Sequence, residues 1–408
     1  MRSLVLLSAL YLSAMCATQS FAAGCSEWFK GNSPRWEDPQ ASDMAITEPD
    51  CYGWRLFIAM NWPADVTKKE ADQNKTFGSH GPVVWETWRS ARNGAPDTAF
   101  PVDGSDPGPW LDAPVVATMN NRFEETEPPL QQTERAAVIK AHGGPTVLFD
   151  PATAGKSINE TRLNRDTYEF IRGRKLYNLN GQMALFKSGT ETISFPLNSK
   201  EVKAQWREIT EADKPRYHWT ESNTPEGVKI FGLTALHITT KDLPNWFWAT
   251  FEHIDNKKAN ANANPPAEGW LLPSVDRFAC SMAPYDCEAI PLGIGLEGNH
   301  WENYRLRGTQ IDFFDSRGRP LRLANSQPEG TFQTTSSCIT CHALASVNDS
   351  AIADGRRLEF FDDDGQGFVG VPTGFFDDQG DRKFTQLDFV WSLFRACFES
   401  PGSTTCNR

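Results

Sequence analysis

Two stretches of the chain carry the densest pattern of hydrophobic residues. Residues 228–239 and 246–253 are rich in β-branched and aromatic side chains, and a short segment that includes Pro244 separates them. This pattern predicts an antiparallel hairpin with a longer loop. Because side chains alternate along a strand, the second run should present two different faces. One face carries Phe247, Ala249, Phe251 and His253, and the other carries Trp246, Trp248, Thr250 and Glu252.

Helical spacing predicts several short helices elsewhere. Trp54, Phe57 and Ile58 are spaced as on one side of a helix that ends at Trp62-Pro63. We also expect short helices over residues 82–93 and 164–176, strands around a turn over residues 182–195, and a C-terminal amphipathic helix over residues 386–398. With 30 Gly and 27 Pro residues in the chain, these elements predict a loop-rich α+β fold of β-hairpins and short helices.

A short pattern occurs three times in the last third of the chain. Each copy has two phenylalanines, an aspartate and, three residues later, a glycine. The copies are Phe313-Phe314-Asp315 with Gly318, Phe360-Phe361-Asp362 with Gly365, and Phe375-Phe376-Asp377 with Gly380. Aspartate and glycine favour tight turns, so the pattern predicts three hairpin tips.

The chain begins with the features of an export signal. Arg2 precedes an apolar run over residues 4–15, and the small residues around Ala22 suit cleavage after that position. We therefore expect residues 1–22 to be a signal peptide and the protein to be periplasmic. A lipid anchor on Cys25 is the less favoured alternative. No later run is long and apolar enough to predict a membrane span.

The polar stretch over residues 256–266 is a possible domain boundary. It would divide the chain into residues 23–255, with short helices and the hairpin, and residues 256–408, unless both parts form one continuous domain. The net charge of −12 becomes −13 when the signal with Arg2 is removed, because residues 1–22 contain no acidic residue. Such an acidic protein does not suit binding to nucleic acid or anionic lipid.

Residues 338–342 read Cys-Ile-Thr-Cys-His, a spacing with a specific chemical use. Two thiols separated by two residues can form thioethers with the two vinyl groups of one porphyrin, and the next residue places an imidazole under the iron. The hydroxyls of Ser336 and Ser337 can cap the helical turn that this needs. A zinc site would require a second ligand pair of similar spacing, and a thioredoxin-like dithiol should follow a strand.

At this motif the chain resembles the c-type cytochromes. The resemblance covers the five motif residues and their flanks and no more of the chain. It implies one covalent haem c, held by Cys338 and Cys341, with His342 as an iron ligand. It also makes residues 256–408 the expected haem-bearing, cytochrome c-like part.

The remaining cysteines are even in number. Outside the signal and the motif the chain has six, which in an oxidising compartment predicts three disulfides. Pairing by proximity gives Cys25–Cys51, Cys280–Cys287 and Cys397–Cys406, although six cysteines allow other connectivities.

The second axial ligand of the iron must come from upstream, because neither Met nor His follows His342. The candidates are His80, His142, His218, His237, His253, His300, Met44, Met60, Met119, Met183 and Met282. We single out His253, which ends the aromatic strand beside Glu252, and Met282, which lies between Cys280 and Cys287.

The sequence leaves two functions open. The first is electron transfer by an exported monohaem c-type cytochrome to a redox partner that the sequence does not identify. The alternative is a haem-dependent oxidoreductase, peroxidase- or oxygenase-like, acting on peroxide or a small organic substrate. Here His253 and Glu252 would serve on the distal side, with Arg305 or Arg307 near His300 to stabilise charge.

Overall fold

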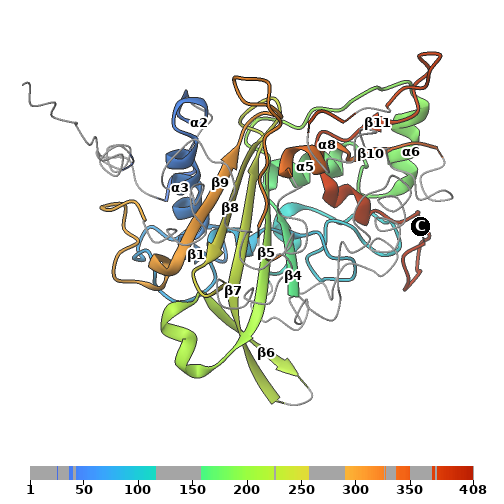
Figure 1. Cartoon of the computed structure of the whole chain (residues 1–408). Helices are drawn as coiled ribbons and strands as arrows, with labels where there is room; N and C mark the ends of the chain where they lie inside the picture. The colour runs from blue at the N-terminus through green and yellow to red at the C-terminus, as the bar shows by residue number, and fades with distance from the viewer. Residues whose placement is uncertain are drawn as a thin grey trace, which may run out of the picture.

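The computed structural model is a mixed α+β fold built on one large antiparallel sheet (Figure 1). It describes Cys25, Gln327 and residues 36–39, 43–115, 158–224, 227–256, 290–325, 337–349, 370–372 and 375–407. The predictions that concern the signal peptide, Cys280–Cys287, Met282, His142 and the second copy of the phenylalanine pattern lie outside these residues.

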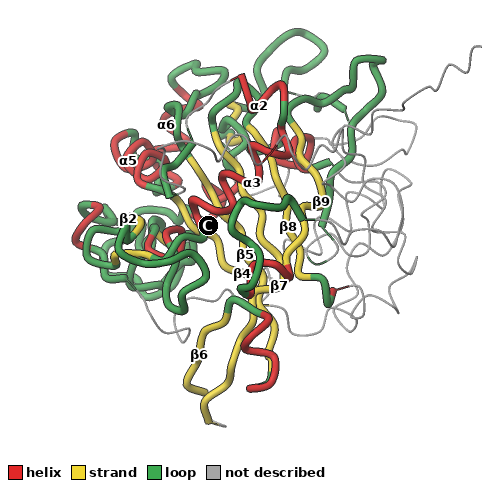
Figure 2. The backbone as a smooth tube through the Cα atoms, turned by 90° about the vertical axis from the view of Figure 1, so that its left-hand side faces the viewer, coloured by secondary structure: helices red, strands yellow, loops and turns green. Residues whose placement is uncertain are grey.

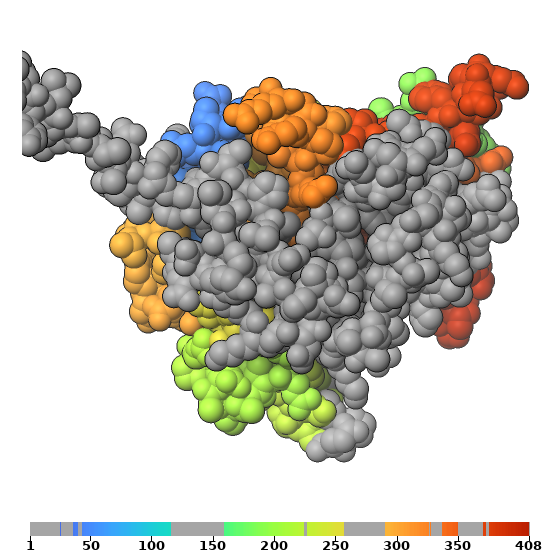
Figure 3. Space-filling model, in the orientation of Figure 1, coloured from blue at the N-terminus to red at the C-terminus, as the bar shows by residue number. Residues whose placement is uncertain are grey.

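The large sheet has seven strands in the order β3-β4-β5-β7-β8-β9, and β6 also pairs with β7. The strands are β3 (Arg89–Ser90), β4 (Ile158–Leu163), β5 (Lys200–Ile209), β6 (Trp219–Thr224), β7 (Gly227–Thr240), β8 (Phe247–His253) and β9 (Tyr304–Gln310). Two further pairs are small: β1 (Ala64–Asp65) with β2 (Glu70–Ala71), and β10 (Ser346–Val347) with β11 (Thr385–Gln386). The end of the sheet that carries β6 and the 3-10 helix η4 (Glu211–Arg216) protrudes from the body of the molecule (Figure 3).

The predicted hairpin is confirmed. β7 pairs with β8 antiparallel, with Thr240 opposite Phe247 and Ala235 opposite Glu252. β9 continues the sheet on the far side of β8, with His253 opposite Tyr304 and Trp248 opposite Gln310. β9 comes after the possible domain boundary in the sequence and nevertheless belongs to the same sheet.

The helix predicted around Trp54 is confirmed as α3 (Pro49–Met60), which follows the short α2 (Asp43–Thr47). Pro49 suits its first turn. At the other end, Asn61 is the cap, and its backbone N–H donates to the carbonyl of Phe57. α3 lies across one face of the sheet (Figure 2). Its Trp54 and Phe57 rings pack against Phe251, with centroids 5.1 and 4.5 Å away. This packing explains why the aromatic face of β8 is fully buried.

Two other predicted helices differ in their outcome. Residues 164–176 contain α5 (Arg165–Gly173), which Asn164 caps by accepting from the N–H of Thr167. Residues 82–93 contain only the 3-10 helix η1 (Val84–Thr87) before β3. Short 3-10 helices also occur as η2 (Trp110–Asp112) and η6 (His300–Asn303).

Two secondary-structure predictions near the C-terminal half are wrong. Residues 182–195 do not form strands around a turn, because α6 (Leu179–Lys187) occupies the first part, capped by Asn178. Residues 386–398 do not form one helix: β11 ends at Gln386, a turn follows, and η8 (Trp391–Arg395) is a 3-10 helix. Tertiary hydrogen bonds described below hold that turn, so helical spacing of the apolar residues did not decide the local structure.

The two described copies of the phenylalanine pattern form the same hairpin tip. Asp315 N donates to Arg319 O and Gly318 N to Asp315 O, both at 2.9 Å. The equivalent bonds at Asp377 and Gly380 are 2.9 and 3.0 Å. Gly318 and Gly380 have φ angles of 73° and 84°, in the left-handed region that glycine favours. The prediction is confirmed for both copies.

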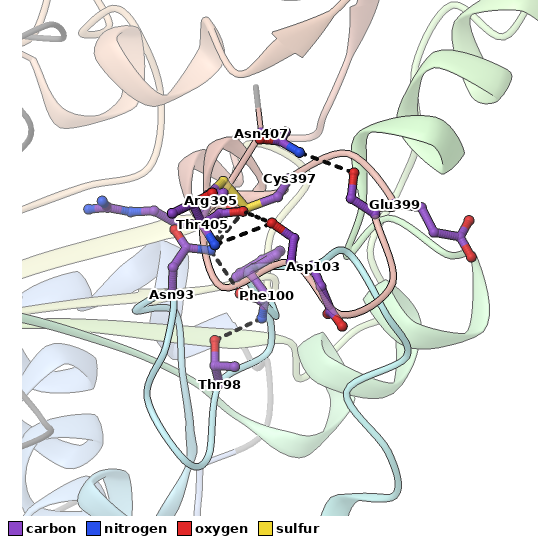
Figure 4. The surroundings of a disulfide bond; sticks show 12 residues. Asn93, Thr98, Phe100, Asp103, Arg395, Cys397, Glu399, Thr405 and Asn407 are labelled. Carbon is purple, nitrogen blue, oxygen red and sulfur yellow. Dashed lines mark hydrogen bonds between the residues drawn. A yellow bond between two sulfur atoms is a disulfide. The ribbon is translucent and has the colours of Figure 1, made fainter.

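Two of the three predicted disulfides are present, Cys25–Cys51 and Cys397–Cys406. The first joins Cys25 to α3 through Cys51. The second closes a loop at the C-terminal end, where the side-chain amide of Asn93 donates to the carbonyls of Phe100 and Arg395, each at 2.8 Å (Figure 4). These bonds join the C-terminal segment to the loop that follows β3.

Candidate haem-attachment site

The Cys-Ile-Thr-Cys-His motif lies on a short helix, α8 (Cys338–Ala343), on the opposite side of the sheet from α3 (Figure 1). Ser337 caps α8, because its side chain accepts from the N–H of Thr340. Cys341 N donates to Ser337 O at 3.0 Å, which closes one helical turn. That turn puts Cys338 and Cys341 three residues apart on the same side of α8. Both are half-buried, and neither forms a disulfide.

His342 is oriented by the backbone of another segment. Its Nδ1 lies 3.0 Å from the carbonyl oxygen of Phe389. A carbonyl can only accept a hydrogen bond, so the Nδ1 atom carries the proton and the lone pair of a neutral ring belongs to Nε2. Histidines that bind metals are commonly held in this way, with one nitrogen donating to a carbonyl and the other facing the metal.

The carbonyl of Phe389 is held by an unusual turn. Asp388 and Phe389 are successive non-glycine residues with positive φ angles, 48° and 69°. The Asp388 carboxylate accepts from Phe195 N and Lys241 Nζ, each at 2.7 Å. Burial raises the pKa of Asp388, and Lys241 opposes this shift. These contacts stabilise the turn that replaces the predicted C-terminal helix.

The surroundings of α8 show which face of the sheet it occupies. The ring of Trp248 lies 4.5 Å from that of His342. Gln310, opposite Trp248 in the sheet, accepts from Ile339 N at 3.1 Å and donates to Ser337 Oγ at 2.8 Å. α8 therefore lies on the Trp248 face of the sheet, which we call the motif face.

A second set of contacts joins α8 to the C-terminal segment. Trp391 Nε1 donates to Cys341 O at 2.6 Å. Thr340 Oγ1 donates to Gly370 O at 2.7 Å. The helix is thus held from several sides by segments that are distant in the sequence.

His253, the favoured second ligand, is not brought together with His342. It follows Phe251 on the face that α3 covers, and its ring stacks on Tyr217 at 3.6 Å. Its Nδ1 accepts from Asp255 N at 3.1 Å, so the Nε2 atom, 3.0 Å from Arg216 O, donates. Burial lowers the pKa of His253 to about 4. Both nitrogens have partners, and the sheet lies between this ring and α8.

The side chain of Glu252 lies on the motif face, whereas that of its neighbour His253 lies on the α3 face, because side chains alternate along a strand. Glu252 is fully buried, with Arg307 Nε 3.3 Å from its carboxylate. Arg305 is also buried, and its guanidinium donates to the carbonyl of Tyr304 at 3.0 Å.

The remaining described histidines, other than His237, gather at the far end of the sheet. His218 lies 3.2 Å from Glu86, and its ring is 5.9 Å from that of His300. His80 stacks on Trp219 at 4.0 Å. Burial lowers the pKa of His300 to about 3, and His218 and His80 add to the effect. The structure places these histidines with His253 and not with the motif.

Of the candidate ligands, His237 lies on the same face of the sheet as the motif, although the sequence did not distinguish it from the other candidates. In β7 it lies opposite Thr250, so it shares the motif face with Trp248. Its Nε2 atom is buried and has no hydrogen-bond partner. Burial lowers the pKa of His237 to about 3, and Lys203 and His342 contribute. Counting the hairpin register from Thr240 opposite Phe247 would have placed His237 on this face.

Across the described part of the chain, no group of three or more His, Cys, Asp or Glu side chains has the arrangement of a metal site. The same residues include no helix with the length and apolar character to cross a membrane. Comparisons with protein-family models, with curated proteins and with solved structures found no match to this chain.

Proposed function

We propose that this protein is an exported monohaem c-type cytochrome that transfers electrons. Cys338 and Cys341 would hold the haem, and His342 would bind its iron. The observation that carries the proposal is the hydrogen bond from His342 Nδ1 to Phe389 O, 3.0 Å long. This bond leaves the lone pair of a neutral His342 ring on Nε2, the nitrogen that could bind a metal. His342 directly follows Cys341 on the helical turn that also carries Cys338.

The attachment chemistry needs only groups that the motif supplies and the porphyrin. Each thiol adds across one vinyl double bond: sulfur forms a bond to one carbon, and the thiol proton ends on the other. No oxidant or reductant is consumed. When bound, the haem would supply iron that alternates between the ferric and ferrous states. The chain would orient His342 through Phe389 and exclude water with Trp248 and Trp391.

Two further features support an exported cytochrome. The disulfides Cys25–Cys51 and Cys397–Cys406 are typical of oxidising compartments, where c-type haem proteins mature. The signal-like residues 1–22 agree with that location. We propose a periplasmic location and an unidentified protein redox partner.

A haem-dependent oxidoreductase is the second candidate, because the motif face carries buried polar groups. Glu252 and Arg307 are fully buried, 3.3 Å apart, and His237 lies on the same face. Such groups could move a proton or stabilise developing charge near a peroxide or a small organic substrate. Steady turnover of peroxide with a reduced donor would favour this candidate over a carrier.

Haem staining after denaturing electrophoresis tests the proposal. Protein exported from cells that attach haem should keep the stain, and a double Cys338→Ala, Cys341→Ala variant should lose it. His342→Ala should reduce haem incorporation, whereas His253→Ala, on the opposite face, should stain like the wild type. A wild-type band without stain would refute covalent haem.

A further inference from the structure

The motif face carries a row of polar side chains on its central strands, and three of their buried atoms have no hydrogen-bond partner. Asn159 lies opposite Gln205, and Lys203 lies opposite His237. The Oδ1 atom of Asn159, the Oε1 atom of Gln205 and the Nε2 atom of His237 are buried and have no hydrogen-bond partner. A buried polar atom without a partner costs roughly 1–3 kcal/mol, so a bound group that met one of these atoms would remove that cost.

His237 is the member of this row that lies nearest to the motif in the sheet register. Thr239 is directly opposite Trp248, and His237 is the next residue of β7 on that face. Such diagonal neighbours lie about 7–8 Å apart, within reach of an aromatic side chain. The Trp248 ring in turn lies 4.5 Å from that of His342. Trp248 is therefore next to His342 by ring contact and a diagonal neighbour of His237 in the sheet register.

The chemical state of His237 suits an iron ligand. A metal binds the neutral imidazole, whose ring nitrogen offers a lone pair. Burial and the neighbouring positive charge of Lys203 both favour the neutral ring. His253 differs, because hydrogen bonds occupy both of its nitrogens.

We propose that His237 Nε2 would be the second protein ligand of the haem iron, in addition to His342. This inference rests on the proposed function. It names a ligand that would give a six-coordinate iron, as expected for an electron carrier.

Absorption spectra and carbon monoxide binding of purified, haem-bearing proteins test the inference. The wild type should be low-spin in both oxidation states and should bind carbon monoxide weakly. His237→Ala should become high-spin. If the ligand leaves the iron in less than a tenth of molecules, its removal should raise the apparent affinity for carbon monoxide by at least about tenfold. Added imidazole should restore the low-spin spectrum of the variant.

His253→Ala is the matched control, because it removes a buried histidine from the other face, and its spectrum should equal that of the wild type. If His237→Ala does not fold, His237→Gln keeps a polar side chain of similar size and should show the same change. A haem-bearing variant with an unchanged spectrum and carbon monoxide affinity would overturn the inference alone. A high-spin wild type would also overturn it. Wild-type protein without covalent haem would overturn the proposed function as well.

Discussion

The two faces of the seven-stranded sheet are packed by different kinds of contact. On one face, α3 presents aromatic rings to aromatic rings: Tyr52 meets Phe247 at 4.9 Å, and Phe57 meets Phe251 at 4.5 Å. On the motif face, α8 is held by two hydrogen bonds with Gln310 and by the contact of the Trp248 ring with His342. Buried polar atoms without partners occur on both faces, among them Trp54 Nε1 in α3 and His237 Nε2 on the motif face.

This difference in contacts predicts that the two faces contribute differently to the stability of the fold. Apolar burial is the main stabilising contribution to a fold, and the α3 face concentrates it. Burial of a polar group such as Glu252 costs free energy, so we expect the motif face to contribute less to stability. We therefore expect the largest losses of stability from substitutions on the α3 face.

The largest effect on stability is expected from Phe57→Ala. The Phe57 ring is fully buried and lies within 6.0 Å of the rings of Trp54, Phe251, Trp301 and Tyr304. Removing it should lower the free energy of unfolding by about 3–5 kcal/mol in urea titrations. Phe57→Leu, which keeps most of the volume, should cost much less. A loss below about 1 kcal/mol for Phe57→Ala would contradict the α3 face as the main core.

A smaller, pH-dependent effect is expected at Glu201 on the motif face. It lies opposite Thr239, and its carboxylate accepts from Ser392 Oγ. Burial raises the pKa of Glu201 to about 7 from 4.5, although the bond from Ser392 opposes this. Between these values the folded protein holds a proton that the unfolded chain has lost, so this residue's contribution to stability falls as pH rises.

Glu201→Gln should remove this loss of folding stability at higher pH, because glutamine does not titrate. The variant should match the wild type near pH 4 and gain on the order of 2–3 kcal/mol relative to it by pH 8. Glu208→Gln is the control: it lies on the same strand, but it is exposed and pairs with half-buried Lys229 at 3.1 Å. Glu208→Gln should shift stability little at any pH. A constant difference between Glu201→Gln and the wild type across this range would contradict the prediction.

The smallest effect is expected from Thr250→Val, also on the motif face. Thr250 Oγ1 accepts from Asn325 Nδ2 at 2.7 Å. Loss of this one hydrogen bond should cost about 1 kcal/mol in urea unfolding, and Thr250→Ser should restore most of it. A cost as large as that of Phe57→Ala would mean that both faces contribute equally to the core.

Sequence patterns predicted the parts of the fold that depend on local chemistry. Alternation identified β7 and β8, and the Asp and Gly positions identified the two described hairpin tips. α3 followed from the spacing of its apolar residues, and its end, predicted at Trp62-Pro63, lies at Met60 with Asn61 as the cap. The disulfides Cys25–Cys51 and Cys397–Cys406 followed from parity and proximity.

The wrong or incomplete predictions depend on contacts between distant segments. The turn at Asp388 is stabilised by Lys241 and Phe195, which lie far from it in sequence. Choosing between His253 and His237 required the sheet register and the position of α8. The sequence placed His253 beside Glu252, but sequence neighbours in a strand point to opposite faces.

Mass spectrometry of the denatured, exported protein tests the central claim most directly. The account predicts that the wild-type chain carries the mass of one haem, and that a proteolytic peptide containing residues 338–342 retains it. The double Cys338→Ala, Cys341→Ala variant should carry none. A wild-type chain without the added mass, or with haem on a different peptide, would contradict the account.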